Sequence, residues 1–163
     1  MKWRNLILRS VVTALTTLLL TVISLQAVKA ASQIIQNGGS GWSNWGGTWF
    51  TQPSGGYING YHYTFNVNNV AEAGATWASS VSGNCEVYAY VPAHSVEYRT
   101  RSAHYVTHNP YAVKTINQDQ YPTLVAYGIL FSTCSNTTLN LDDATGETYG
   151  TKYVVYDEAL FIN

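Results

Sequence analysis

The stretch that decides the fold lies at the end of the chain and reads Tyr153-Val154-Val155-Tyr156-Asp157-Glu158-Ala159-Leu160-Phe161-Ile162. Both alternating sets of side chains are largely apolar, which predicts a single strand that is covered on both faces. In a regular strand Asp157 shares a face with Val155 and Ala159, whereas Glu158 points the other way. Asp157 therefore either meets hydrogen-bond donors in the interior or marks a place where that face opens to water or to a ligand.

The chain before this stretch has the same character from residue 48 onward. Runs rich in Tyr, Val, Thr, Phe and Trp alternate with short turn sequences of Gly, Asn, Pro and Ser, which predicts an all-β antiparallel sandwich of two sheets. In the run from Glu86 to Pro92, alternation places Val87, Ala89 and Val91 between the sheets and the tyrosines on the wetter side. The predicted strands cover residues 48–52, 61–67, 75–79, 85–91, 103–108, 112–117, 124–133, 138–141 and 152–162.

The first thirty residues are predicted to be a signal peptide, so that the protein is secreted or extracellular. Lys2 and Arg4 precede an uncharged apolar run, and Val28-Lys29-Ala30 places small residues where a signal peptidase cleaves. An uncleaved anchor is the alternative, because about 19 uncharged residues suffice to span a bilayer. Residues 31–47 form a Gly/Ser/Asn-rich segment, and residues 48–163 form a single β-sandwich domain with no further membrane span.

Removal of the leader changes the charge of the protein. Four basic residues then face nine acidic ones, which gives a formal charge of −5. This acidic balance argues against nucleic acid or an anionic membrane surface as the partner.

Both cysteines lie in the exported part, and they are predicted to form a disulfide. Cys85 begins one apolar run and Cys134 ends another, with no CxxC motif or histidine cluster nearby. Such a bond closes a loop of about 50 residues and stabilises by about 4 kcal/mol. A reactive thiol is the weaker hypothesis, because Glu86 beside Cys85 disfavours a thiolate.

The order of short motifs resembles the golvesin C-terminal-like domain, also called the golvesin or xanthan lyase CBD-like domain. The similarity covers nearly all of the chain after the leader. It departs from the usual pattern at residues 121–128 and around the final Asp, at Glu158 and Leu160. The matching motifs are Gly47-Thr48-Trp49, Gly56-Tyr57, Gly60-Tyr61, Ala75-Thr76-Trp77, Cys85 to Pro92, Ala103-His104-Tyr105 with His108, Asn117-Gln118, Gly128 with Phe131, and Val154-Val155-Tyr156-Asp157 with Phe161.

The resemblance implies a jelly-roll-like β-sandwich of exported bacterial proteins, which accompanies surface enzymes and binds carbohydrate without cleaving it. It also makes Val154 to Asp157 a landmark of the fold. Asp157 is then expected to be a buried acceptor for backbone or hydroxyl donors that fixes the last strand.

Aromatic residues are the best candidates for a ligand site. Trp49 and Trp77 lie within predicted strands and are expected to be structural. Trp42 and Trp45 lie in a glycine-rich stretch that is hard to bury as a loop, and such rings can stack against the C–H face of a sugar.

A second group of candidates follows in the chain. Tyr57, Tyr61 and Tyr63, together with His62, mix rings with hydrogen-bond donors, as hydroxyl recognition requires. Tyrosine-rich strands of an exported sandwich are equally explained as ordinary outer faces.

Neither a metal nor a cofactor is expected. His104 and His108 share a strand face but lie about 13 Å apart, too far to hold one ion. The acidic turn with Asp142, Asp143 and Glu147 lacks the spacing of an EF-hand loop, and a solvated turn is preferred to a Ca²⁺ site.

Three functional hypotheses remain. The preferred one is a non-catalytic module that binds polysaccharide or cell-envelope glycan through exposed aromatic residues. The alternative is a small surface or matrix protein that acts by protein contact. A polysaccharide-degrading enzyme is third, because separation of Asp157 from Glu158 on a regular strand removes the best pair of carboxyls for glycoside hydrolysis, although other acidic pairs stay possible.

Overall fold

The computed structural model describes residues 32–58, 60–92, 98–109, 111–120, 125–134 and 136–163, with backbone only for 84 and 125–134. The regular elements in these ranges are twelve β-strands, and residues 31–163 form one compact unit. The predicted signal peptide, residues 1–30, lies outside the described ranges. Within those ranges, no helix is long and apolar enough to cross a membrane.

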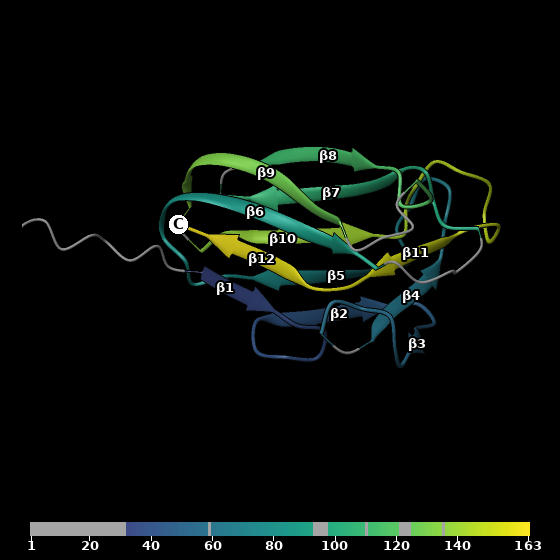
Figure 1. The fold of residues 1–163 in the computed structure, drawn as a ribbon. Coiled ribbons are helices and arrows are strands. Elements are labelled where there is room, and N and C mark those ends of the chain that lie inside the picture. The colour runs from purple at the N-terminus through teal and green to yellow at the C-terminus, as the bar shows by residue number, and fades with distance from the viewer. Residues whose placement is uncertain (1–31, 59, 93–97, 110, 121–124, 135) are drawn as a thin grey trace, which may run out of the picture. The chain divides into compact units, whose positions relative to one another are not determined.

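The strands form three antiparallel sheets (Figure 1). The four-stranded sheet has the order β1 (Ser32–Ile35), β12 (Ala159–Ile162), β6 (Gly83–Val91), β9 (Val125–Cys134). The five-stranded sheet has the order β2 (Trp42–Gly46), β5 (Ala73–Ala78), β10 (Thr138–Asp142), β7 (Ala103–His108), β8 (Ala112–Ile116). The three-stranded sheet has the order β11 (Tyr153–Tyr156), β4 (Tyr61–Phe65), β3 (Phe50–Gln52). The prediction of an all-β, jelly-roll-like antiparallel fold is confirmed, although the strands form three sheets where the sequence predicted two.

The core draws buried side chains from all three sheets. Val87, Ala89 and Val91 on β6 are buried, as their alternation predicts, and Trp77 on β5 is buried opposite them in the same hydrophobic cluster. One tyrosine of β6 differs from the prediction, because Tyr90 is also buried. Its ring stacks against Tyr57 from a separate loop, which covers it from solvent.

The prediction of one continuous strand at the C-terminus is wrong. β11 ends at Tyr156 and β12 begins at Ala159, and the two belong to different sheets. Asp157 and Glu158 form the break, so the regular alternation does not apply to them. Their carboxyl groups lie within hydrogen-bonding reach of each other rather than on opposite faces.

The expectation that Asp157 is a buried hydrogen-bond acceptor is confirmed. Its Oδ2 accepts the backbone N–H of Tyr57 at 3.0 Å, and its backbone carbonyl accepts the indole N–H of Trp77 at 2.9 Å. The break between β11 and β12 is thereby tied to β5 and to the loop that carries Tyr57. It joins parts of the chain that are distant in sequence.

The sequence predicted no strand before residue 48, but residues 32–47 contribute two strands to the sheets. β1 pairs with β12, and β2 pairs with β5, with Trp42 directly opposite Trp77. Two glycines allow this stretch to turn sharply at either end of β2. Gly41 and Gly46 both have positive φ, and a side chain on Gly46 would collide with the carbonyl oxygen of Glu72.

Candidate functional site

The six predicted ligand-binding residues do not form one site. Trp42 and Tyr63 pack against the core, the His62 ring stacks on Trp42, and Tyr61 is almost completely buried at 1% exposure. Tyr63 and Tyr57 lie in two other ring clusters, and Trp45 stands apart from all of them. Each place offers a different surface to a ligand.

Trp42 and His62 belong to an inner aromatic cluster. Their rings stack with centroids 5.4 Å apart, and Trp49 contacts both of them edge-on. Trp49 also packs against the buried ring of Tyr156 at 4.7 Å. Burial lowers the pKa of His62, whose Nδ1 lies 3.0 Å from Thr51 Oγ1. This cluster connects the three-stranded sheet with the core, and the rings of Trp42, Trp49 and His62 are partly buried in it.

Tyr63 belongs to a row of rings on the opposite face of the three-stranded sheet. It stacks against Phe50 at 5.1 Å and meets Tyr153 edge-on at 5.2 Å. Phe65 extends the row and is 42% exposed. The sequence pointed to Tyr63 but not to its partners, because Phe50 and Tyr153 reach it only through strand pairing.

Tyr57 lies above the break between β11 and β12. Its ring stacks against Tyr90 at 4.2 Å, while its backbone N–H donates to Asp157. Burial and the neighbouring Tyr57 hydroxyl raise the pKa of Tyr90 to about 12. One face of the Tyr57 ring is thus covered by Tyr90, and the hydrogen bond to Asp157 holds its loop in place.

Trp45 is the predicted residue whose ring is best presented to solvent. It lies on β2 at the edge of the five-stranded sheet, with 48% of its surface exposed. Gly74 is its direct partner on β5. A Cβ on Gly74 would lie 2.8 Å from Cζ2 and 2.9 Å from Cε2 of the indole, so the absence of a side chain there lets the ring lie across the sheet.

Polar side chains continue from Trp45 across the same face of the sheet. Strand pairing places Asp142 opposite Gly74, and it places Asn140 opposite Thr76 in the next row. The Thr76 hydroxyl donates to Asn140 Oδ1 at 2.6 Å. Burial raises the pKa of Asp142, and the hydrogen bond from the Ala144 N–H and the nearby His104 partly oppose this effect. An exposed ring beside fixed hydroxyl, amide and carboxyl groups suits a ligand with both C–H and O–H faces.

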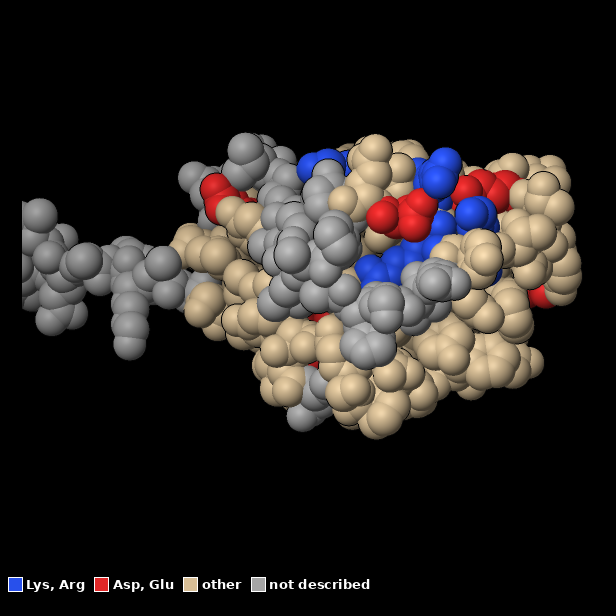
Figure 2. All heavy atoms as spheres, turned by 45° about the vertical axis from the view of Figure 1, so that its right-hand side comes forward, with Lys and Arg blue, Asp and Glu red and all other residues tan. Residues whose placement is uncertain are grey.

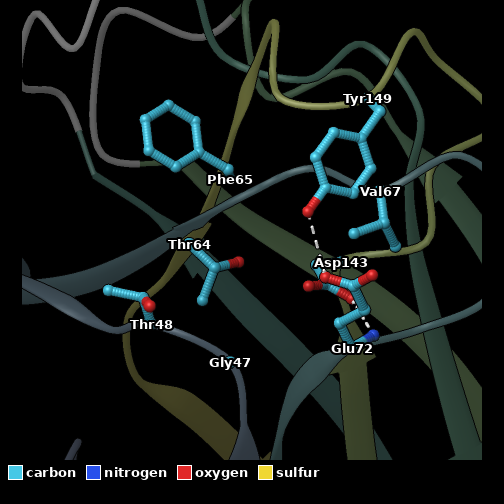
Figure 3. A pocket seen from close by; sticks show the side chains of 8 residues that line it. All are labelled: Gly47, Thr48, Thr64, Phe65, Val67, Glu72, Asp143 and Tyr149. Atoms are coloured by element: carbon cyan, nitrogen blue, oxygen red, sulfur yellow. Dashed lines mark hydrogen bonds between the residues drawn. The ribbon is translucent and has the colours of Figure 1, made fainter.

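A pocket lies at one end of the sandwich, where no single sequence motif indicated a site. Its volume is about 180 Å³. Figure 3 shows the rings of Phe65 and Tyr149 above the carboxyl groups of Glu72 and Asp143. Gly47, Thr48, Thr64 and Val67 complete the lining. The residues come from β4 and from separate loops, and only the fold brings them together.

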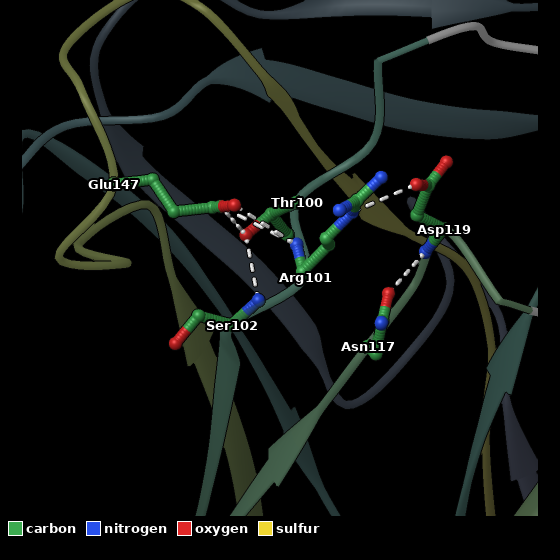
Figure 4. A network of polar contacts seen from close by, with 6 residues as sticks. All are labelled: Thr100, Arg101, Ser102, Asn117, Asp119 and Glu147. Atoms are coloured by element: carbon green, nitrogen blue, oxygen red, sulfur yellow. Dashed lines mark hydrogen bonds and ion pairs between the residues drawn. The ribbon is translucent and has the colours of Figure 1, made fainter.

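The acidic turn does not direct its carboxyl groups at one point. Asp142 Oδ1 accepts the N–H of Ala144, and Asp143 Oδ1 accepts the N–H of Glu72. Glu147 instead accepts hydrogen bonds from the Thr100 hydroxyl and the Arg101 N–H (Figure 4). Within the described ranges, no group of three or more His, Cys, Asp and Glu side chains is arranged to hold a metal.

Charged side chains of both signs lie together on the surface. Arg101 Nε forms an ion pair with Asp119 Oδ2 at 3.0 Å (Figure 4). Figure 2 shows Lys and Arg gathered on one part of the visible face with Asp and Glu among them. This part of the surface therefore has no uniform positive charge of the kind that binds a phosphate backbone.

The two histidines of β7 have separate neighbours. His104 Nε2 lies 3.2 Å from Ser102 Oγ, whereas the His108 ring lies 5.7 Å from the ring of Tyr111. They face the same side of the strand without sharing a partner.

Comparison with known proteins supports the fold. No family model matches the sequence, and no curated protein matches it. Among solved structures, a Paenibacillus xanthan lyase matches 81% of this chain with a TM-score of 0.62 and 20% identity, over 13% of the lyase chain. A family 35 carbohydrate-binding module from Clostridium thermocellum matches 80% of this chain and 98% of its own, with a TM-score of 0.52 and 14% identity.

A further match concerns an enzyme of larger size. The exo-β-1,3-galactanase of Phanerochaete chrysosporium matches 80% of this chain but only 29% of its own, with a TM-score of 0.51 and 12% identity. This chain thus spans a small part of both enzymes and nearly the whole of the binding module. The described domain has the fold of a carbohydrate-binding module.

Proposed function

We propose that this protein is an exported, non-catalytic carbohydrate-binding domain of the golvesin C-terminal-like kind, and that Trp45 is its main contact with polysaccharide or cell-envelope glycan. One observation carries the proposal. The Trp45 indole lies across Gly74 with nearly half of its surface exposed, next to a face that carries Thr76, Asn140 and Asp142. A flat ring beside fixed polar groups matches the alternating C–H and O–H surface of a sugar.

The structural matches support the same class of ligand. The family 35 modules from Clostridium thermocellum and Cellvibrio japonicus are carbohydrate-binding proteins that this chain matches over 98% and 93% of their lengths. The lyase and the galactanase act on polysaccharides and contain a similar domain as a small part of their chains. A binding role for the fold is consistent with a similar domain forming a small part of an enzyme chain.

The non-catalytic role is supported by the position of the best carboxyl pair. Asp157 and Glu158 lie close together but are 1% and 2% exposed. A glycosidase needs two carboxyls that flank a substrate bond in an accessible cleft. The pair is instead buried beneath the loop that carries Tyr57, whose backbone N–H donates to Asp157.

The test is affinity electrophoresis of the protein without residues 1–30 in gels that contain xanthan, β-1,3-galactan or xylan. The proposal expects retardation in at least one gel and no loss of chain length of the polysaccharide. Migration unchanged in all gels and on a wider glycan array would contradict it. Depolymerisation of any substrate would contradict the non-catalytic part alone.

Contact with another protein is the second candidate, because the row of rings on the three-stranded sheet is partly open. Phe65 is 42% exposed at the end of this row, next to Tyr153. Sedimentation at increasing protein concentration distinguishes the protein-contact role from the carbohydrate-binding role. Association that Phe65→Ser abolishes, without any glycan binding, would favour the protein interface.

A further inference from the structure

We propose that the pocket between Phe65, Tyr149, Glu72 and Asp143 binds a single sugar unit that carries no negative charge, either neutral or amino-substituted. This second site is separate from the Trp45 surface. The inference rests on the proposed function in taking the ligand to be a sugar, but it concerns different residues and a different part of the domain.

The pocket has the size of one ring. Its volume of about 180 Å³ lies below the roughly 300 to 1,000 Å³ of pockets that take drug-sized ligands. Gly47 lines it, and a Cβ at this position would lie 2.6 Å from the side chain of Ala73, so a larger residue does not fit there. The end unit of a glycan, or a single side-chain sugar, fits such a space better than the middle of a chain does.

The walls combine the two kinds of surface that a sugar presents. Phe65 and Val67 are apolar, and the exposed ring of Tyr149 lies across from Thr64 (Figure 3). The Thr48 hydroxyl and the carboxyls of Glu72 and Asp143 supply hydrogen-bonding groups, whereas the Thr64 hydroxyl already bonds to the Tyr156 hydroxyl. Rings take the C–H face of a sugar, while hydroxyls and carboxylates bond its O–H groups.

The two carboxyl groups are held in place by the chain itself. Asp143 Oδ1 accepts the backbone N–H of Glu72 at 2.9 Å, and the Tyr149 hydroxyl donates to Glu72 Oε2 at 3.2 Å. Carboxylate acceptors form strong bonds with hydroxyl and ammonium donors. A ligand therefore meets acceptors that are already oriented and needs to supply the donors.

The charge of the lining decides which sugars enter. Glu72 and Asp143 are its titratable acids, Tyr149 is its other titratable group, and no Lys, Arg or His is among the eight lining residues. A uronate or a sulfated sugar would bring a negative charge next to two carboxyls, which costs binding energy. An amino sugar would gain from the same arrangement, and a neutral hexose would pay no such cost.

A calcium ion is the other ligand that carboxyl groups suggest. Ca²⁺ takes six to eight oxygen ligands, whereas this pocket offers two carboxyls, one of which is bonded to a backbone N–H. The described residues also hold no group of three or more possible ligands. We therefore take the carboxyls as acceptors for sugar donors and treat the metal as an outcome of the test.

The experiment is a two-dimensional ¹H–¹⁵N titration of the whole domain with methyl glucoside, methyl galactoside, methyl mannoside, glucosamine and glucuronate, each with and without CaCl₂. The inference expects the amide signals of Gly47 and Thr48 to shift with at least one neutral hexoside and with glucosamine, but not with glucuronate. Glu72→Gln should weaken glucosamine binding about tenfold, because it removes a charge-assisted bond.

Glu86→Gln is the matched control. Glu86 accepts a hydrogen bond from the Tyr88 hydroxyl on β6, as Glu72 does from Tyr149, but it lies outside the pocket. This variant should leave the titration unchanged. Tyr149→Phe keeps the ring and both carboxyls but removes the hydroxyl that donates to Glu72. It should weaken glucosamine binding less than Glu72→Gln does.

Three results would overturn the inference. These are glucuronate binding as tightly as glucosamine, calcium alone shifting the pocket amides without any sugar effect, or no pocket amide moving with any sugar. If the pocket fails while a polysaccharide still binds and Trp45→Ala removes that binding, the proposed function stands without this second site. If no polysaccharide binds either, the proposed function has failed as well.

Discussion

The carboxyl groups of Asp157 and Glu158 lie side by side in the interior, in the two-residue break between β11 and β12. Asp157 Oδ1 and Glu158 Oε2 are buried and meet no N–H or O–H donor among the described residues. Two such carboxyls can bond to each other only if one of them carries a proton. Burial raises the pKa of Asp157 above its ordinary value, and the neighbouring Glu158 raises it further.

This pair predicts that the domain becomes less stable as the pH rises. Because the pKa of Asp157 is raised in the folded state, folding retains a proton that the unfolded chain loses above about pH 4. Its contribution to stability is complete below that pH and declines towards the raised pKa, by at most about 1.4 kcal/mol per pH unit. Urea unfolding at pH 5 and pH 8 should show the loss.

Asp157→Asn should flatten this dependence, because an amide keeps an oxygen for the Tyr57 N–H and offers an N–H to Glu158. The variant should match the wild type at pH 5 and exceed it at pH 8. Asp119→Asn at the surface is the control and should keep the wild-type slope. An Asp157→Asn variant with the full pH dependence would show that this carboxyl is not the cause.

Gly74→Ala tests the support beneath Trp45. The added Cβ would meet the indole at 2.8 Å and the carbonyl oxygen of Leu141 at 3.1 Å, so the ring must move. We expect a stability cost of about 1 to 3 kcal/mol, as for overpacked sites, and a clear loss of glycan affinity. Thermal melting and affinity electrophoresis measure the two effects. Ala78→Ser, on the same strand face, should change neither, and unaltered binding by Gly74→Ala would argue against a fixed ring.

The disulfide between Cys85 and Cys134 remains a prediction that the strand pairing supports. Gly83 pairs with Cys134 and Cys85 pairs with Phe131, so the two cysteine positions lie near each other on β6 and β9. Non-reducing digestion and mass spectrometry should find the linked peptides, and reduction should cost about 4 kcal/mol for a loop of about 50 residues. Two thiols that alkylate fully without a reductant would disprove the bond.

Deletion of residues 159–163 should prevent folding. It removes β12, which lies between β1 and β6, together with the fully buried side chains of Ala159 and Phe161. Circular dichroism should then show no cooperative melting. Deletion of Asn163 alone keeps the whole of β12 and serves as the control. A soluble variant without residues 159–163 that melts cooperatively would contradict this account of the last strand.

Much of the strand pattern could be predicted from the sequence, because alternation and turn residues are local signals. β7 begins and ends where it was expected, and β6 starts two residues earlier than expected, at Gly83. The break at Asp157 could not be seen, since apolar residues continue on both sides of it. β1 and β2 were missed because their glycine-rich segment gains strand structure only by pairing with β12 and β5.

In the candidate site, too, the contacts that depend on long-range strand pairing could not be predicted from the sequence. Trp45 was identified because a large ring in a glycine-rich stretch is hard to bury. Gly74, which supports the ring, was not, because it lies 29 residues away in sequence and meets Trp45 only by strand pairing. Tyr61 was chosen for its type and turned out to be buried. Residue type indicates what a side chain can bind, but long-range packing decides whether it is presented.

The most direct test of the central claim is calorimetric titration of Trp45→Ala with the polysaccharide that retards the wild type in the gels. The proposal that the exposed indole is the main contact predicts that the affinity falls about tenfold or more, with little change in melting temperature. Tyr111→Ala, an exposed ring beside the opposite edge strand of the same sheet, is the control and should bind as the wild type does. Wild-type affinity in Trp45→Ala would contradict the account.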